Sequence, residues 1–528
     1  MFFSRYRNRQ PASGTKKNQN EPIDPSLDQL FSYIKQEFSE SPDFVIRTFS
    51  AGNNNETRFG IIYLECLVDE KVIDEWVIKS LTLASGLLPK EFDDEALSFD
   101  MVKNRALSIG KIAILETKEK IIKSILSGNA VLVGAGWKKA ISCSTASEKS
   151  RPISEPTAQS VIRGPLDSFT ESIKVNLSLI RCRIRSPHLK VKSLDLGHFT
   201  HTKIFVLHIE GIANPKIVND VLKRLKEIDI DSVLESGYIE SFLEEKTFTP
   251  FPTVLTSGRP DDICGNLMDG RVAILVDNSP FALVVPSSFR HLFMASEDYY
   301  QRYDIASFLR LVRFVSFFVS LVLPSLYVAL ITHHPQMLPT SLLINLSAQR
   351  ENVPIPTLFE AIIMELMFEV IREAGIRAPR VLSTAITIVG AIVLGQTAVS
   401  AGLVTPAMVI VVAITGLASF VNPSYELAIT ARLIRFVMMI LAATFGMLGI
   451  TLGLVVMISH MNSLSSFGVP YLEPFSPLNL KAWGDTFIRL PLWMIRKRPA
   501  ALHPLKKNMI AKYRLRNGRP SKEEDGSG

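Results

Sequence analysis

The sequence predicts an α/β water-soluble N-terminal half with two subdomains, followed by an all-α polytopic transmembrane domain. Charged residues are dense up to Arg313 and become sparse from Phe314 to Met461, so the two halves suit different solvents. The first uncharged run, Phe314–Ile331, covers 18 residues, and a helix of that length spans about 27 Å, close to the thickness of the hydrocarbon layer. The N-terminus has no apolar run of signal-peptide length, so we expect the soluble half to lie in the cytoplasm.

Shifts in composition along the 528 residues predict the domain boundaries. A polar, basic start has nothing to bury and is typical of a disordered tail, and a stretch rich in Ser, Glu and Pro is typical of a linker. We expect a disordered basic tail at 1–24, a first α/β subdomain at 25–143, a linker at 144–157, a second α/β subdomain at 158–300, a transmembrane helical domain at 301–495 and a basic tail at 496–528.

Helical and extended patterns alternate in the first subdomain. The spacing of apolar residues predicts helices at Leu27–Phe38, Glu75–Leu83 and Lys118–Leu126, and strands at Phe44–Phe49 and Phe59–Val68.

The second subdomain shows the same alternation. We expect a helix at Asp167–Arg181, strands at Leu189–Leu196 and Lys203–Ile209, and a helix at Pro215–Ile228. Asn214 is a good N-cap and is followed by proline at the first helical position, which makes the start of the last helix well defined.

Two hairpin-like segments have the same form. Gly128–Gly134 is followed by Lys138–Ser142, and Gly270–Val276 is followed by Phe281–Val285. Either the subdomain is repeated, or two generic hairpins resemble each other by chance.

The C-terminal half contains further apolar runs. No charged residue occurs between Arg380 and Glu426, and Thr405-Pro406 interrupts this run once, which predicts two membrane helices joined by a very short turn. The last long span is expected at Phe436–Ser459. Arg310 and Arg313 directly precede the first span, which places its N-terminal end in the cytoplasm by the positive-inside rule.

Two segments are ambiguous as membrane crossings. Leu358–Ile371 is apolar but carries three acids, which would be costly if they faced lipid, so it is either a crossing enclosed by protein or a helix in the interface. Leu478–Met494 contains charges and two tryptophans and looks interfacial.

The three acids of Leu358–Ile371 lie on different sides of the predicted helix. Glu365 and Glu369 share a helical face, and Glu360 points away. These acids either pair structurally, as Glu369 can with Arg372, or form a vestibule that attracts cations.

Two stripes of small residues share the spacing i, i+4, i+7, i+11. They are Ala391, Gly395, Ala398 and Gly402 in one predicted helix, and Ala442, Gly446, Gly449 and Gly453 in another. This spacing puts small side chains on one face and lets helices approach closely in lipid. The stripes serve either packing within one subunit or packing between subunits around a shared pore.

The predicted helix Ser383–Val404 also carries a polar strip. Gln396 and Ser400 lie four residues apart in an uncharged run, where polar groups need partners or water. Either they form a hydrogen bond to a neighbouring helix, or they line a wet pore in which Val399 or Leu403 forms the apolar constriction.

Signals for an enzyme are absent from the sequence. No GxxxxGK[ST], HExxH, GxSxG or GxGxxG segment occurs, so we expect no catalytic residues, no cofactor and no metal site. The net charge of +7 is concentrated at the two ends of the chain and comes without a nucleic-acid-binding motif, so no nucleic acid is expected as a partner. The four cysteines are far apart and form no CxxC pair: Cys66, Cys143, Cys182 and Cys264.

A series of motifs resembles the spore germination receptor A subunits, the GerA family. The segment Glu155–Pro165, followed by Phe169, Glu171, Asn176 and Leu179-Ile180-Arg181, is similar to the signature of that family. Further similar segments follow in order: Ile209–Asn214, Ser236–Glu240, Phe251-Pro252, Thr256–Asp261, Gly270–Asp277, Ser296–Tyr300, Asn422–Leu427 and Arg432–Met438. The chain departs from the family pattern at Leu166-Asp167, where an Arg-Glu pair is expected, and at Ala158-Gln159, where an acidic residue is usual.

The resemblance implies a subunit of a nutrient germinant receptor in the inner membrane of the dormant bacterial endospore. It implies partners: a transporter-like B subunit, a lipoprotein C subunit and further copies of the chain itself, in a ring that is expected to be pentameric and to form a germinant-gated cation channel in contact with membrane lipid. The alternative is a membrane scaffold or transporter-like component that binds a small molecule and conducts no ions.

Overall fold

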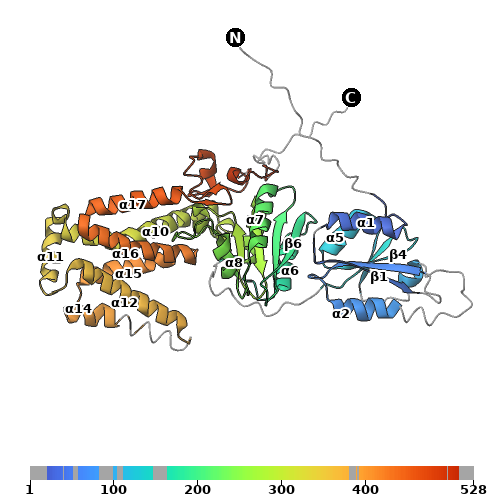
Figure 1. Ribbon diagram of the computed structural model, residues 1–528, viewed down its shortest axis with the longest axis horizontal. Helices are drawn as coiled ribbons and strands as arrows, with labels where there is room; N and C mark the ends of the chain where they lie inside the picture. Colours follow the sequence, from blue (N-terminus) through green and yellow to red (C-terminus); the bar gives the residue numbers. More distant parts are fainter. Residues whose placement is uncertain are drawn as a thin grey trace, which may run out of the picture.

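The computed structural model shows two β-sheet units followed by a group of long helices (Figure 1). It describes residues 21–39, 41–51, 57–81, 99–103, 111–146, 163–379, 388, 390, 392–495 and 497–509. The tail predicted at 1–24 and the linker predicted at 144–157 lie mostly outside these residues, so the proposed domain boundaries there stay predictions.

The first sheet has five strands, all paired antiparallel in the order β1-β2-β4-β5-β3. The strands are β1 (Phe44–Ala51), β2 (Thr57–Leu64), β3 (Ile112–Leu115), β4 (Ala130–Gly134) and β5 (Ala140–Cys143). Helices α1 (Leu27–Glu37) and α5 (Lys118–Leu126) cover one face, and α2 (Glu70–Val72) with the π-helix η1 (Ile73–Ile78) lies on the other (Figure 1). Both faces are therefore buried, and the strands β4 and β5 are buried along their whole length.

The second sheet repeats this arrangement. Its strands pair antiparallel in the order β6-β7-β9-β10-β8. They are β6 (Leu189–Leu196), β7 (Thr202–Ile209), β8 (Leu255–Ser257), β9 (Val272–Val276) and β10 (Ala282–Val285). Helices α6 (Ile173–Arg183) and α9 (Pro260–Asp269) pack on one face, and α7 (Pro215–Glu227) and α8 (Ser236–Leu243) on the other.

The two hairpins noted in the sequence occupy the same place in their sheets. They are β4–β5 and β9–β10, and each forms the fourth and fifth strand of its unit. The shared strand order favours a repeated subdomain over a chance resemblance between hairpins. The α/β half with two subdomains is confirmed.

Local signals explain most of these elements. The Asn214 side chain accepts a hydrogen bond from the Lys216 amide at 3.1 Å, and Pro215 follows as the first residue of α7, as predicted. The helix predicted from Asp167 instead begins at Ile173. The Asn176 amide bonds both the N–H and the carbonyl of Thr170, at 2.8 and 2.6 Å, which holds the preceding residues in a non-helical turn.

A buried ion pair joins the two units. Arg181 of α6 is 1% exposed and forms two 3.0 Å hydrogen bonds with the carboxylate of Asp43, directly before β1. It also donates to the Leu189 carbonyl at 3.0 Å and to the Ser41 hydroxyl at 3.2 Å. These contacts fix α6 against the first sheet because a buried guanidinium needs partners for its N–H groups.

The C-terminal half is helical. Its main helices are α10 (Tyr303–Thr332), α11 (Thr340–Arg350), α12 (Thr357–Arg377), the π-helix η6 (Val393–Thr397) with α14 (Ala398–Ser400), α15 (Pro406–Phe420), α16 (Tyr425–Phe445) and α17 (Met447–Asn462). Helices α10 and α16 are long and apolar enough to cross a membrane, and α15 and α17 are shorter apolar helices. The predicted fold class, an α/β half followed by an apolar helical half, is confirmed.

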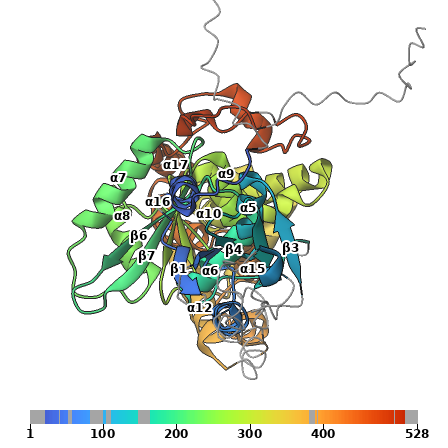
Figure 2. The ribbon, with the colours of Figure 1, turned by 90° about the vertical axis from the view of Figure 1, so that its right-hand side faces the viewer.

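The second sheet and the helices share one hydrophobic core. Phe289 and Phe293 follow β10 and pack edge-to-face on Phe317 of α10, with ring centroids 5.8 and 5.5 Å apart. The segment after α17 returns to the same place, where the Tyr471 carbonyl accepts a hydrogen bond from the Phe289 amide at 2.8 Å. This C-terminal segment is drawn in red at the top of Figure 2. A movement of α10 would therefore disturb the core of the second unit.

Candidate functional site

A buried carboxylate holds the turn before α15. The Thr405 hydroxyl accepts a hydrogen bond from the Met408 amide at 3.3 Å, and Pro406 begins the helix. Glu360 of α12 is fully buried, and its Oε1 accepts hydrogen bonds from the Thr405 amide and the Thr405 hydroxyl, each at 2.7 Å. The turn predicted at Thr405-Pro406 is present, and Glu360 supports it.

The described part of the candidate pore helix is short. It comprises η6 and α14, whereas the helix was predicted over Ser383–Val404, and 383–387, 389 and 391 lie outside the described residues. A π-helical turn in an apolar segment is uncommon and occurs often at functional sites.

The polar strip lies on the surface of the chain. Gln396 and Ser400 are exposed, and the Ser400 hydroxyl donates to the Gln396 carbonyl at 2.7 Å. The Gln396 side chain forms no hydrogen bond with any residue that the structure describes. Val399 is half-buried, and Leu403 is 52% exposed. Within the described chain, the strip is therefore not tied to a neighbouring helix.

The first stripe of small residues does not form one continuous helical face. Ala391 lies outside the described residues. A Cβ on Gly395 would meet no atom within 4 Å, whereas Ala398 is buried. Gly402 follows the helix with φ +65°, and a Cβ there would lie 2.9 Å from the Asn352 carbonyl oxygen. The π-helical turn and the early helix end break the regular spacing that the prediction assumed.

The second stripe is divided between two helices. Gly446 has φ +60° and ψ −139°, a conformation essentially restricted to glycine, and it separates α16 from α17. The single span predicted at Phe436–Ser459 is therefore wrong. The chain reverses at Gly446 and forms a helical hairpin, in which α17 lies beside α16 (Figure 1).

Two glycines of this stripe allow the hairpin to close. A Cβ on Gly449 would lie 2.0 Å from the Leu441 carbonyl oxygen, and a Cβ on Gly453 would lie 2.4 Å from the Met438 sulfur. Ala442, on α16, is fully buried. At these positions the small residues serve packing within one chain.

The remaining acids of α12 face arginines of α16. Glu365 is buried and pairs with Arg435 at 2.5 Å, and the Arg435 Nε donates to the Ser320 carbonyl of α10 at 2.6 Å. Glu369 pairs with Arg432 at 2.7 Å and also with Arg372, the structural partner that the sequence suggested. The carboxylates of Glu360, Glu365 and Glu369 thus contact other groups of the same chain. Their role in a vestibule that attracts cations stays a prediction.

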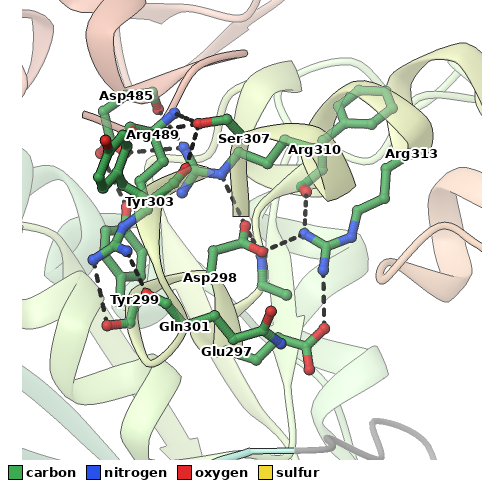
Figure 3. A network of polar contacts seen from close by, with 12 residues as sticks. Glu297, Asp298, Tyr299, Gln301, Tyr303, Ser307, Arg310, Arg313, Asp485 and Arg489 are labelled. Carbon is green, nitrogen blue, oxygen red and sulfur yellow. Dashed lines mark hydrogen bonds and ion pairs between the residues drawn. The ribbon is translucent and has the colours of Figure 1, made fainter. Parts of the chain in front are cut away.

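A second polar network lies where the second sheet unit meets α10 (Figure 3). Asp298 is 1% exposed and receives two arginines of α10, Arg310 at 2.8 Å and Arg313 at 2.7 Å. Arg313 also pairs with Glu297 at 3.0 Å, and Arg310 pairs with Asp485 of the C-terminal segment at 2.9 Å. The two arginines predicted to flank the membrane span are thus enclosed by carboxylates of the protein.

The C-terminal segment completes this network. The Tyr299 hydroxyl donates to Asp485 at 2.9 Å. The Arg489 guanidinium donates to the carbonyls of Gln301 and Tyr299, at 2.8 and 3.3 Å, and its backbone N–H donates to the Ser307 hydroxyl at 3.0 Å (Figure 3). Three segments distant in sequence are therefore joined at one point: the 3-10 turn η4 (Ser296–Tyr299), the start of α10 and the segment after α17.

Burial sets the protonation of the groups beside α10. Burial raises the pKa of the Tyr299 hydroxyl, and the Asp485 carboxylate raises it further. Burial lowers the pKa of the Arg489 guanidinium. Tyr299 therefore stays a protonated donor to Asp485 across the physiological range.

Sequence reasoning missed the partners in this network. Asp298 and Asp485 lie 12 and 175 residues from Arg310, and no periodicity connects such positions. The family-like segment Ser296–Tyr300, which contains Asp298, was the available signal.

The family model and the similar sequences agree with one another. The family described as "Bacillus/Clostridium GerA spore germination protein" matches residues 32–501. "Spore germination protein KA" of Bacillus subtilis is 43% identical over 91% of this chain and 87% of its own length. "Spore germination protein A1" of the same organism is 40% identical over 82% of this chain and 88% of its own length. A crystal structure is also similar, that of the N-terminal domain of the A subunit of the Bacillus megaterium spore germinant receptor GerK3. The match is 33% identical in sequence, covers 51% of this chain and 98% of the crystallised chain, and has a TM-score of 0.41.

Proposed function

This chain belongs to the GerA family of spore germination proteins, and we propose that it is the A subunit of a nutrient germinant receptor whose helices line a germinant-gated cation channel. In this proposal several copies, five in the implied ring, surround a shared axis in the spore inner membrane. Opening the channel releases cations and triggers germination.

One observation carries the channel part of the proposal. Gln396 and Ser400 are exposed on an uncharged helical segment, and the Gln396 side chain has no hydrogen-bond partner among the described residues. Polar groups at membrane depth need protein partners or water. If copies of the chain surround a shared axis, this helix can face a water-filled pore, and the water then hydrogen-bonds the strip. Leu403 and Val399 would form the apolar constriction of that pore.

The family also suggests partners and an orientation. We place a transporter-like B subunit and a lipoprotein C subunit in the same receptor, and the α/β half on the cytoplasmic side of the membrane. The buried contacts between Asp298 and the arginines of α10 support a mechanical role for the α/β half, because a shift of that half would pull on α10 directly.

The constriction can be tested by replacing one exposed leucine. Leu403→Ser is expected to cause cation leakage, or germination without nutrient, because a hydroxyl wets an apolar constriction. Leu417 of α15 is 69% exposed and provides a matched control, since Leu417→Ser makes the same change outside the proposed pore. Potassium release from spores should be measured beside receptor abundance by immunoblot.

The outcome separates a channel from a scaffold that conducts nothing. Leakage in Leu403→Ser but not in Leu417→Ser, at equal abundance, supports the channel. Normal release and normal abundance in both variants would remove this helix from the pore.

A further inference from the structure

A large cavity lies beside the Asp298 network. Its volume is about 1310 Å³, above the range of about 300–1,000 Å³ that is usual for small-molecule sites. Its walls come from α9, the segment 290–301, the start of α10, the turn between α15 and α16, and the C-terminal segment. The cavity is therefore lined by both the α/β half and the helices.

Two buried polar side chains in its wall have no hydrogen-bond partner among the residues that the structure describes. Arg290 is 6% exposed and forms no hydrogen bond or ion pair with any residue in the described parts of the chain. Asn422, in the turn between α15 and α16, is 8% exposed, and neither its amide nitrogen nor its amide oxygen has a partner among the same residues. An unpaired buried guanidinium is costly, so a ligand that accepts hydrogen bonds from it would stabilise this site.

Asp269, whose carboxyl interacts electrostatically with Arg290, is a weak counterion for it. Asp269 of α9 lines the same cavity but forms no ion pair with Arg290 among the described contacts. Burial raises the pKa of the Asp269 carboxyl, which favours its neutral form. Lys497, His503 and Lys507 line the cavity and are exposed, so basic side chains also stand at its opening.

One part of the cavity wall is apolar and lies at the expected membrane surface. Leu309 and Val312 lie within five residues of the uncharged run of α10 that begins at Phe314. Leu490 and Ile495 contribute from the C-terminal segment, which also exposes Trp483, a residue type common at membrane interfaces. The cavity thus combines an apolar wall at membrane level with a buried cation that has no ion-pair partner in the described part of the chain.

We propose that this cavity binds an anionic phospholipid, with the phosphate on Arg290 and Asn422 and the upper part of the acyl chains along the apolar wall of α10 and the C-terminal segment. A phosphate ester accepts hydrogen bonds from a guanidinium in the bidentate geometry that arginine favours. A free phosphate could make the same polar contacts but would leave the apolar wall uncovered. Binding there would tie lipid to the junction between the α/β half and α10.

Native mass spectrometry of the full-length chain in detergent can test this lipid site. Phosphatidylglycerol and phosphatidylcholine with the same acyl chains are compared, and inorganic phosphate is a third arm. The wild-type chain should retain one phosphatidylglycerol with a preference of about tenfold over phosphatidylcholine. Arg290→Gln should reduce this preference to near unity, whereas Arg302→Gln, at an arginine whose side chain is 75% exposed, should leave it unchanged.

A second variant tests the cavity without removing the charge. Gly265 lies on α9 in the cavity wall, and a Cβ there would meet no atom within 4 Å. Gly265→Phe should fill the cavity and abolish the preference while the helix keeps its stability, since glycine is a poor helix former. Gly265→Ala should keep the preference. Equal retention of both lipids by the wild-type chain, an unchanged preference in both Arg290→Gln and Gly265→Phe, or displacement of the lipid by inorganic phosphate at equal concentration would overturn the proposal.

Discussion

Gly449→Ala is expected to prevent the folded chain from accumulating. The added Cβ would lie 2.0 Å from the Leu441 carbonyl oxygen and 3.1 Å from the Phe445 Cβ, so α17 could not stay in place beside α16. The clash is with backbone atoms, so no side chain can move aside to relieve it. We therefore expect the free energy of unfolding to fall by about 3 kcal/mol or more. The amount of receptor in membranes, followed by immunoblot, and the thermal stability of the purified chain measure the effect.

Two other glycines serve as graded controls. A Cβ on Gly453 would meet the flexible end of Met438, so Gly453→Ala should cost less. A Cβ on Gly395 would meet nothing within 4 Å, so Gly395→Ala should leave the folded chain intact and affect only contacts between subunits. Equal abundance and stability for Gly449→Ala and Gly395→Ala would contradict the hairpin.

Asp298→Asn is expected to weaken the junction strongly. Asp298 is the shared partner of Arg310 and Arg313, both of which are buried, and its loss leaves two guanidinium groups without their central counter-charge. Removing one partner of a buried ion pair typically costs about 3–5 kcal/mol. The change should appear as a lower melting temperature of the full-length chain in detergent.

A matched substitution lies six residues further along the chain. Asp304 pairs with Arg302 at 3.0 Å, but the side chains are 47% and 75% exposed, so Asp304→Asn should cost about 1 kcal/mol or less. A melting temperature of Asp298→Asn that equals that of Asp304→Asn would show that the junction does not depend on this carboxylate.

The sequence predicted those parts of the fold that depend on local signals. The helix α7 follows from Asn214 and Pro215, the strand β6 from apolar residues interspersed with polar ones, and the strand β7 from a largely apolar run. The hairpin at Gly446 could not be predicted from hydropathy, because Phe436–Ser459 is uncharged throughout and reads as one span. The reversal depends on one glycine with φ +60° and on close packing between two helices, which hydropathy does not record.

In the candidate site, too, local features could be predicted from the sequence and long-range contacts could not. The turn at Thr405-Pro406 and the polar strip at Gln396 and Ser400 follow from local residue types. The partners of Arg310 and Glu365 lie far away in sequence, at Asp485 and Arg435, and only the folded chain brings them together. Arg310 and Arg313 were expected only to mark the cytoplasmic end of the first span, and their enclosure by carboxylates depends on the folded chain.

The central claim is that the helix carrying Gln396 lines a cation pore. The most direct measurement introduces Gln396→Cys into the leaking Leu403→Ser variant and follows cation efflux from membrane vesicles before and after a positively charged methanethiosulfonate reagent is added. Leu417→Cys in the same variant controls for labelling of an exposed position outside the proposed pore. The chain without an added cysteine controls for labelling of the native cysteines, which all lie in the α/β half. A pore lined by Gln396 predicts that efflux falls only in the Gln396→Cys variant. Complete modification of that cysteine, shown by mass, with unchanged efflux would contradict the claim.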